Sequence, residues 1–252
     1  MQEHTNSSMK KEERKSTNAI LLLSHIHQDH IQGFTFFNPM HIKSTTIDVF
    51  GDSDFESDLS QELSNLLFGK SFPLDLSDIA GQLNIHNLQE ADCIILNGDN
   101  APVIKRLEDD EVIKPKGEEV VITCFKSHAH PQNGVIIYKI AYKNKSIVYA
   151  SDKESYVGGD KKLAKFARNC NLLIHDAQYT TEDYLDTYAP KQGYGHSTFE
   201  MAIEAKKQSK ADKLIFFHYN PSYNDEKLNK LKSEYSSETD IMAYEGLIID
   251  LL

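Results

Sequence analysis

Four potential metal ligands stand within six residues near the start of this chain, and their density constrains the fold more than any other feature. They belong to the segment SHIHQDH at residues 24–30, which follows directly on the apolar run AILLLS at residues 19–24. A continuous apolar run of this length predicts a buried strand that ends in a loop. The loop is therefore expected at the edge of a sheet.

The spacing of these ligands predicts two neighbouring positions for metal. A strand places His25 and His27 on one face, and a turn into a helix at Asp29 brings Asp29 and His30 round toward a second point. Imidazole suits zinc, iron or manganese, and a carboxylate beside it favours a hydrolytic site over a closed structural one. The alternative is a polar, histidine-rich turn at the surface.

The rest of the chain predicts an α/β (α+β) fold in which sheet is covered by helical layers. Residues 1–18 are polar and predict a disordered tail before one domain at 19–252, and residues 97–118 predict a connection without regular structure. Helices are predicted at about 56–68, 160–170 and 198–209 and again after 217, and strands at 19–24, 47–51, 82–88, 93–96, 120–125, 134–142, 146–151, 172–175, 213–217 and 247–251.

The composition limits the cellular compartment and the binding partners that we expect for this protein. Hydrophobic residues make up 40 % of the chain, enough for a substantial core, and 27 Lys and Arg against 38 Asp and Glu give a net charge of −11. So acidic a surface repels phosphate chains, which makes nucleic acid an unlikely partner. Cys93, Cys124 and Cys170 lack CxxC spacing and fit reduced core thiols. With no apolar leader or membrane-length run, we expect a cytoplasmic protein without a membrane partner.

The HxHxDH pattern after a buried strand resembles the metallo-β-lactamase superfamily. The resemblance implies an αββα sandwich with a dinuclear metal site at one sheet edge. It also implies three downstream ligands, each after a later strand: a histidine, then an aspartate, then a last histidine near the C-terminus.

Candidates for all three stand in that order. His130 lies in HPQNG, with His128 as a substitute two residues before it; Asp152 ends IVYASD, and His218 ends KLIFFH. Without the resemblance, Asp152 also suits a helix cap or turn, and His218 suits a core histidine.

The resemblance then implies two divalent metal ions. We expect zinc, with manganese or iron as alternatives. The first metal takes His25, His27 and His130; the second takes Asp29, His30 and His218; and Asp152 bridges the two.

Two further segments resemble ribonuclease Z and related phosphodiesterases of this superfamily. They are GHST at residues 195–198 and HDAQYT at residues 175–180, and the whole run is most similar to bacterial phosphoribosyl-cyclic-phosphodiesterase-like metallohydrolases. The resemblance implies an enzyme that cleaves a small cyclic phosphate or nucleotide by attack of a metal-bound hydroxide.

Within that reaction Asp29 and His196 are the predicted catalytic residues. His196 stands on a glycine-flanked loop, where it can protonate the departing alkoxide or stabilise the charged phosphorane. A compatible reading has Ser197 and Thr198 cap the next helix. His175 and Asp176 either support the metal ligands or make ordinary hydrogen bonds at a strand end.

The sequence departs from the family pattern at its start. Only 24 residues precede His25, so the usual N-terminal strands are expected to be missing, through truncation, a misassigned start or completion of the sheet by a partner chain, such as a second copy in a homodimer. No basic inserted arm for gripping transfer RNA is evident. A glyoxalase-type thioesterase and a non-catalytic metal-binding regulatory module are the alternative functions.

Overall fold

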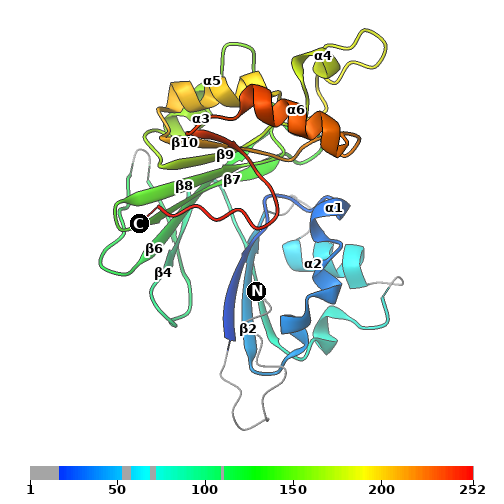
Figure 1. The fold of residues 1–252 in the computed structure, drawn as a ribbon. Helices are drawn as coiled ribbons and strands as arrows, with labels where there is room; N and C mark the ends of the chain where they lie inside the picture. The colour runs from blue at the N-terminus through cyan, green and yellow to red at the C-terminus, as the bar shows by residue number, and fades with distance from the viewer. Residues whose placement is uncertain (1–16, 53–57, 69–71, 109–110, 252) are drawn as a thin grey trace. The chain divides into compact units, whose positions relative to one another are not determined.

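The computed structural model describes residues 17–52, 58–68, 72–108 and 111–251 (Figure 1). The contacts divide the chain into two compact units, Met1–Gln89 and Glu90–Leu252. Most of the predicted tail lies outside the described residues, and its last two residues, Thr17 and Asn18, already belong to the first strand. The predicted single domain at 19–252 stays a prediction.

The first unit is a three-stranded parallel sheet in the order β1-β2-β3, with short helices packed on it. Ile47 and Val49, two residues apart in β2, share a face and pack with Leu59, Leu63 and Phe68 of the helical layer. Its elements are β1 (Thr17–Leu22), α1 (Gln28–Ile31), η4 (Phe34–Phe36), η5 (Asn38–His41), β2 (Thr45–Gly51), α2 (Leu59–Leu63), η6 (Ser64–Phe68), η7 (Leu76–Asp78) and β3 (Gln82–Asn87).

The second unit holds an eight-stranded mixed sheet in the order β11-β10-β9-β8-β7-β6-β4-β5. Neighbouring strands are antiparallel along the series β5, β4, β6, β7 and β8. They are parallel along the series β8, β9, β10 and β11. Its strands are β4 (Asp92–Leu96), β5 (Val103–Arg106), β6 (Val120–Ser127), β7 (Val135–Tyr142), β8 (Lys145–Ala150), β9 (Leu172–Asp176), β10 (Lys213–Phe217) and β11 (Asp240–Met242).

The helices of this unit are α3 (Lys161–Phe166), α4 (Thr181–Tyr184), α5 (Phe199–Ser209) and α6 (Asp225–Tyr235). Figure 1 shows α3, α5 and α6 on one face of the sheet. The core between them joins Ile137 and Val148 of the sheet to Phe199 and Ala202 of α5, all fully buried. Thr198 caps α5 by accepting a hydrogen bond from the Met201 amide, as a helix start requires.

Two predictions about strands are wrong. The predicted connection at 97–118 contains β5, a short, exposed strand that adds to the sheet only by pairing with β4. The predicted strand at 247–251 has no regular structure, and the strand that pairs with β10 near the C-terminus is β11. Neither outcome follows from apolar content: the VIKR of β5 is half charged, and Ile248 is 89 % exposed.

All three cysteines are buried and form no disulfide. Burial raises the pKa of Cys93 and of Cys170 to about 11, which leaves both thiols protonated and unreactive near neutral pH. Among the described residues, no helix is both long and apolar enough to cross a membrane.

Candidate functional site

Four strands of the second unit end at one edge of its sheet, and three of them deliver a predicted ligand there. Strands β6 and β8 both run antiparallel to β7, and β9 and β10 run parallel to β8, so the carboxyl ends of all four coincide. His130 follows β6, Asp152 follows β8, and His218 follows β10. Open α/β sheets bind ligands outside such ends.

Asp152, His196 and His218 form one cluster at this edge. Each offers a potential ligand atom, and these atoms lie within 4.8 Å of one another. His218 Nε2 is 3.1 Å from Asp152 Oδ1, and the rings of His196 and His218 stack with their centroids 5.0 Å apart. This arrangement excludes the core-histidine reading of His218, whose side chain is 20 % exposed.

The backbone at two of these positions is held in an uncommon conformation. Asp152 has φ 55° and His218 has φ 63°, the left-handed region that side chains with a Cβ rarely adopt. Asp152 caps no described helix, which leaves its cap reading without support. Strain of this kind gathers where the surrounding fold fixes a side chain for a task, here to aim both residues at the cluster.

Asp176, at the end of β9, is the fully buried acceptor that organises the cluster. Its Oδ2 accepts hydrogen bonds from His196 Nδ1 at 2.9 Å and from the Asp152 amide at 3.1 Å. Its Oδ1 accepts from the amides of Ser197 at 2.8 Å and Gln178 at 3.2 Å. The carboxylate thus ties the strand end that carries Asp152 to the loop that carries His196.

The hydrogen bond between Asp176 and His196 sets the protonation of the His196 ring. A carboxylate only accepts, so Nδ1 of His196 carries a proton and Nε2 is the atom left for proton transfer. Burial lowers the pKa of His196, but the hydrogen bond and charge of Asp176 outweigh burial, and the pKa is raised above its usual value.

His130 is oriented through its other ring nitrogen. Its Nδ1 donates to the Gly195 carbonyl at 3.0 Å, which places the lone pair on Nε2, the form that binds metal. His130 is buried, whereas His128, the predicted substitute, is exposed. Gly195 has φ +86°, and a Cβ there would lie 2.3 Å from His130 Nδ1, so only glycine fits this approach.

His175 has a structural part in the core. It is fully buried, with Nδ1 donating to the Asp176 carbonyl at 2.7 Å and Nε2 lying 3.2 Å from Ser155 Oγ. Burial lowers its pKa to about 4, so the ring is neutral at physiological pH. Of the two residues left open by the sequence, Asp176 serves the cluster and His175 the strand end.

Of the predicted capping pair, only Thr198 caps α5. Ser197 is wrong as a cap because its hydroxyl is used elsewhere: it donates to the Lys153 carbonyl at 2.6 Å and accepts from the Ser155 amide at 2.9 Å. The GHST loop is thereby attached to the segment that follows Asp152.

Glu154 fastens the same loop from its other side. Its carboxylate accepts hydrogen bonds from the amides of Gly193 at 2.9 Å and Gly195 at 3.0 Å, and from the Tyr184 hydroxyl at 2.5 Å. Its own amide donates to the Ala129 carbonyl at 3.0 Å. Sequence reasoning missed Glu154, because a glutamate after a strand carries no signal beyond its position two residues past Asp152.

In the first unit the HxHxDH segment follows β1 and turns into α1, as predicted. The His25 ring lies 4.5 Å from that of His27 and 4.3 Å from that of His30, measured between centroids. Asp29 is exposed, and its Oδ2 lies 3.4 Å from His30 Nε2. Three imidazoles and a carboxylate therefore gather within one loop.

The donor set in each unit fits divalent transition metals. Imidazoles with a carboxylate and no thiolate suit open, catalytic zinc-type sites. Among the described residues, the HxHxDH loop and the sheet-edge cluster each hold imidazoles and a carboxylate.

Gln178 was also missed by sequence reasoning. Its side-chain amide lies 3.0 Å from His218 Nδ1, where an amide can orient a ligating ring.

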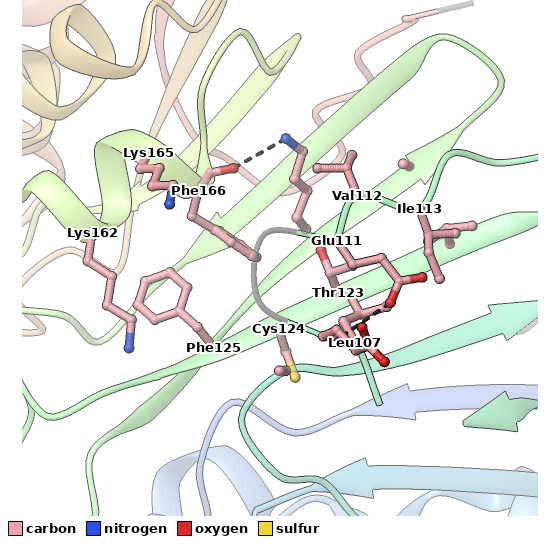
Figure 2. Close-up of a pocket in the computed structure, with 15 residues that line it drawn as sticks. Leu107, Glu111, Val112, Ile113, Thr123, Cys124, Phe125, Lys162, Lys165 and Phe166 are labelled. Atoms are coloured by element: carbon pink, nitrogen blue, oxygen red, sulfur yellow. Dashed lines mark hydrogen bonds between the residues drawn. The ribbon is translucent and has the colours of Figure 1, made fainter. Parts of the chain in front are cut away.

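A separate pocket of about 480 Å³ in the second unit contains none of the predicted site residues. Figure 2 shows its wall, where Lys162 lies over the ring of Phe125 at 4.8 Å and Phe166 stands beside them. We assign it no part in the chemistry of the histidine cluster.

Comparison with known proteins assigns the chain to a family. The model of the β-lactamase superfamily domain matches residues 2–219. Ribonuclease Z of Picrophilus torridus is 27 % identical over 243 residues, which cover 86 % of this chain and 73 % of that protein.

Two solved structures share the fold. The metallo-β-lactamase fold protein YhfI from Bacillus subtilis has a TM-score of 0.60 at 18 % identity, covering 90 % of this chain and 75 % of that one. A diphosphatase from the PhnP family has a TM-score of 0.57 at 15 % identity, covering 92 % and 71 %. They confirm the predicted fold class, and the ribonuclease Z relative confirms the predicted similarity to ribonuclease Z. The chain therefore belongs to the β-lactamase superfamily and is a metal-dependent hydrolase of the metallo-β-lactamase fold.

Proposed function

We propose that this protein is a dinuclear-metal phosphodiesterase that hydrolyses a small cyclic phosphate or nucleotide. The observation that carries the proposal is the His196–Asp176 pair beside Asp152 and His218. A buried carboxylate that fixes the proton of an imidazole next to potential metal ligands suits protonation of a leaving alkoxide. The ribonuclease Z relatives support a phosphodiester bond as the bond cleaved.

The proposed metal ligands are seven side chains. By resemblance to the metallo-β-lactamase superfamily, His25, His27 and His130 would hold one ion, and Asp29, His30 and His218 would hold the other. Asp152 would be a ligand of both. Three observations support this set of ligands: the order of the HxHxDH motif, the tautomer of His130, and the left-handed backbone conformation of Asp152 and His218. When bound, two such ions activate water and neutralise charge on the phosphate oxygens. Zinc is the proposed metal.

The chain's own residues then handle the leaving group. The water first gives one proton to solvent. As its oxygen then bonds to phosphorus, the ester P–O bond breaks, and the protonated ring of His196 gives its Nε2 proton to the departing oxygen. Asp176 keeps Nδ1 protonated and balances the positive charge of the ring before the transfer. Glu154 and Ser197 hold the loop, so that His196 needs no reorganisation during the step.

The test combines turnover with metal content. Protein that is stripped by chelator and reconstituted with zinc should bind about two ions per chain and hydrolyse both bis-p-nitrophenyl phosphate and a cyclic phosphodiester. The stripped protein, before zinc is added, should hydrolyse neither compound. Turnover of a glutathione thioester without phosphodiester turnover would favour the glyoxalase-type alternative. Metal without any turnover would favour the binding module.

RNA is the second candidate substrate, because ribonuclease Z is the name of the curated relatives. The net charge of −11 argues against a long phosphate chain. Precursor transfer RNA with a 3′ trailer belongs in the same assay series: cleavage of it at a higher kcat/KM than the cyclic phosphodiester would replace the small-molecule proposal.

A further inference from the structure

A pocket of about 410 Å³ in the second unit opens beside the histidine cluster, and it is not used by any step above. His130 and Gly195 form part of its wall, and the His130 ring lies 5.2 Å from the His196 ring between centroids. A phosphate placed at His196 would therefore carry its organic substituent to this pocket. Its volume lies in the range of small-molecule sites, about 300–1,000 Å³.

The charges of the wall do not suit a second phosphate. Among the described residues that line the pocket there is no lysine or arginine, and Glu154 contributes a carboxylate. An anion would meet that carboxylate, and the ammonium of Lys153, 5.7 Å from the centroid of the Tyr156 ring, is already paired with Asp160. The pocket therefore suits the uncharged part of a substrate.

The side chains of the wall suit an aromatic ring. Small residues such as Ala129, Ser155 and Gly193 form much of it, and Tyr156 adds an aromatic side chain that is 60 % exposed. Because this exposed ring lines the pocket, a nucleobase can stack on it, since every nucleobase has a face for stacking. His128, exposed on the adjoining loop, adds a polar group for a base edge.

We propose that this pocket binds the nucleobase of the substrate, with Tyr156 as the stacking residue. The proposal rests on the proposed phosphodiesterase function and narrows its substrate class to nucleoside phosphodiesters. An acyl chain or a plain sugar in the same pocket would gain little from stacking on Tyr156.

The test compares two five-membered cyclic phosphates, adenosine 2′,3′-cyclic phosphate, which carries a base on its ribose, and glycerol 1,2-cyclic phosphate, which has neither base nor ribose. Both ester oxygens belong to one polyol in each, so the result does not depend on which oxygen leaves. Wild type should prefer the nucleotide. Tyr156→Ala should lower kcat/KM for the nucleotide about ten- to a hundredfold, the range of one lost base stack, and change the glycerol compound less than about twofold.

Two control variants accompany this comparison. Tyr156→Phe keeps the ring and should keep the preference. Tyr188→Ala removes a tyrosine that is 96 % exposed and outside the pocket wall, and should change neither substrate. Equal kcat/KM of the wild type for the two compounds, or an equal loss of both in Tyr156→Ala, would overturn the proposal.

A binding measurement separates this inference from the proposed function. Adenosine, which has no phosphate, should bind the wild type and Tyr156→Phe by calorimetry, and bind Tyr156→Ala at least about tenfold more weakly. If no phosphodiester is hydrolysed but this difference is found, the function fails and the pocket stands. If phosphodiesters are hydrolysed and adenosine binds all variants equally or not at all, the pocket assignment is wrong.

Discussion

Nδ1 of His196 donates a 2.9 Å hydrogen bond to Oδ2 of Asp176, and the aspartate is completely buried beneath it. The two residues are 20 positions apart and belong to segments that the sequence predicts separately, a strand end and a helix-capping loop. Their pairing fixes which nitrogen of His196 holds its proton and where the ring stands. Most of the following predictions depend on it.

His196→Ala should keep its metal content and lose turnover in proportion to how poor the leaving group is. General acid catalysis contributes about 10²- to 10⁴-fold, so an alkyl or ribose ester should lose rate in that range. Bis-p-nitrophenyl phosphate should lose much less, because nitrophenolate leaves without protonation. Both substrates are measured on one metal-replete preparation. Equal loss on both would assign His196 to charge stabilisation, and loss of metal would make it a ligand.

Asp176→Asn should lower both stability and activity although it changes one atom. Four groups donate hydrogen bonds to the carboxylate, two to each oxygen, so an amide nitrogen faces donors whichever way the side chain turns. A buried donor without an acceptor costs about 1–3 kcal/mol. Chemical denaturation of the metal-free protein measures the cost, with His196→Ala, which removes one donor, as the milder comparison. A variant as stable as wild type would contradict the acceptor-only reading.

His30→Ala should reduce zinc from about two ions per chain toward one, and Asp152→Ala should reduce turnover more than His30→Ala does. A bridging carboxylate sets the separation of two ions as well as binding both, whereas a terminal histidine serves one. Elemental analysis and phosphodiester turnover on the same reconstituted samples give both quantities. Near wild-type turnover in Asp152→Ala would remove Asp152 from the bridge.

Glu154→Gln should reduce turnover at least about tenfold on a poor leaving group while metal content stays at the wild-type value. Three groups donate hydrogen bonds to the Glu154 carboxylate, and the substitution replaces one acceptor oxygen by an amide nitrogen that cannot accept. A hydrogen bond to a charged group contributes about 1.5–3 kcal/mol, so its loss should make the loop that carries His196 less well held.

Tyr184→Phe removes a single hydrogen bond to Glu154 and serves as the matched control, with a smaller expected effect. A structural defect alone would slow activated and poor leaving groups equally. The positioning role requires the leaving-group dependence found for His196→Ala, and its absence in Glu154→Gln would count against that role.

The buried His175 should make stability depend on pH between about 6.5 and 4. Burial lowers the folded-state pKa to about 4, below the unfolded value near 6.5, so the unfolded chain binds the extra proton in this window. The contribution is complete above about pH 6.5 and is lost as pH falls toward 4, by up to about 1.4 kcal/mol per pH unit.

Urea unfolding of the metal-free wild type and of His175→Asn at pH 7 and pH 5 isolates this contribution. The difference in free energy of unfolding between the two should shrink at pH 5, because the variant has no ring to protonate. A difference that stays constant would mean that His175 is not held neutral by the fold.

The sequence by itself determined the elements that depend on local pattern. The apolar run before SHIHQDH predicts β1, the alternation after residue 160 predicts α3, β9, α5 and β10, and Thr198 predicts the start of α5. These follow from burial and capping, which act over a few residues and are visible in composition. The order of HxHxDH, His130, Asp152 and His218 is likewise a property of the chain.

Tertiary structure decided the rest, because it depends on which distant atoms meet. Three contacts join segments far apart in the sequence: the hydrogen bond of His130 to the Gly195 carbonyl, the pairing of Asp176 with His196, and the hydrogen bonds of Glu154 to the amides of Gly193 and Gly195. The same is true of β5 and β11, whose place is set by a neighbouring strand edge more than by their own residues. A carboxylate in a sequence shows its charge but not its donors, and only the folded sheet edge supplies them.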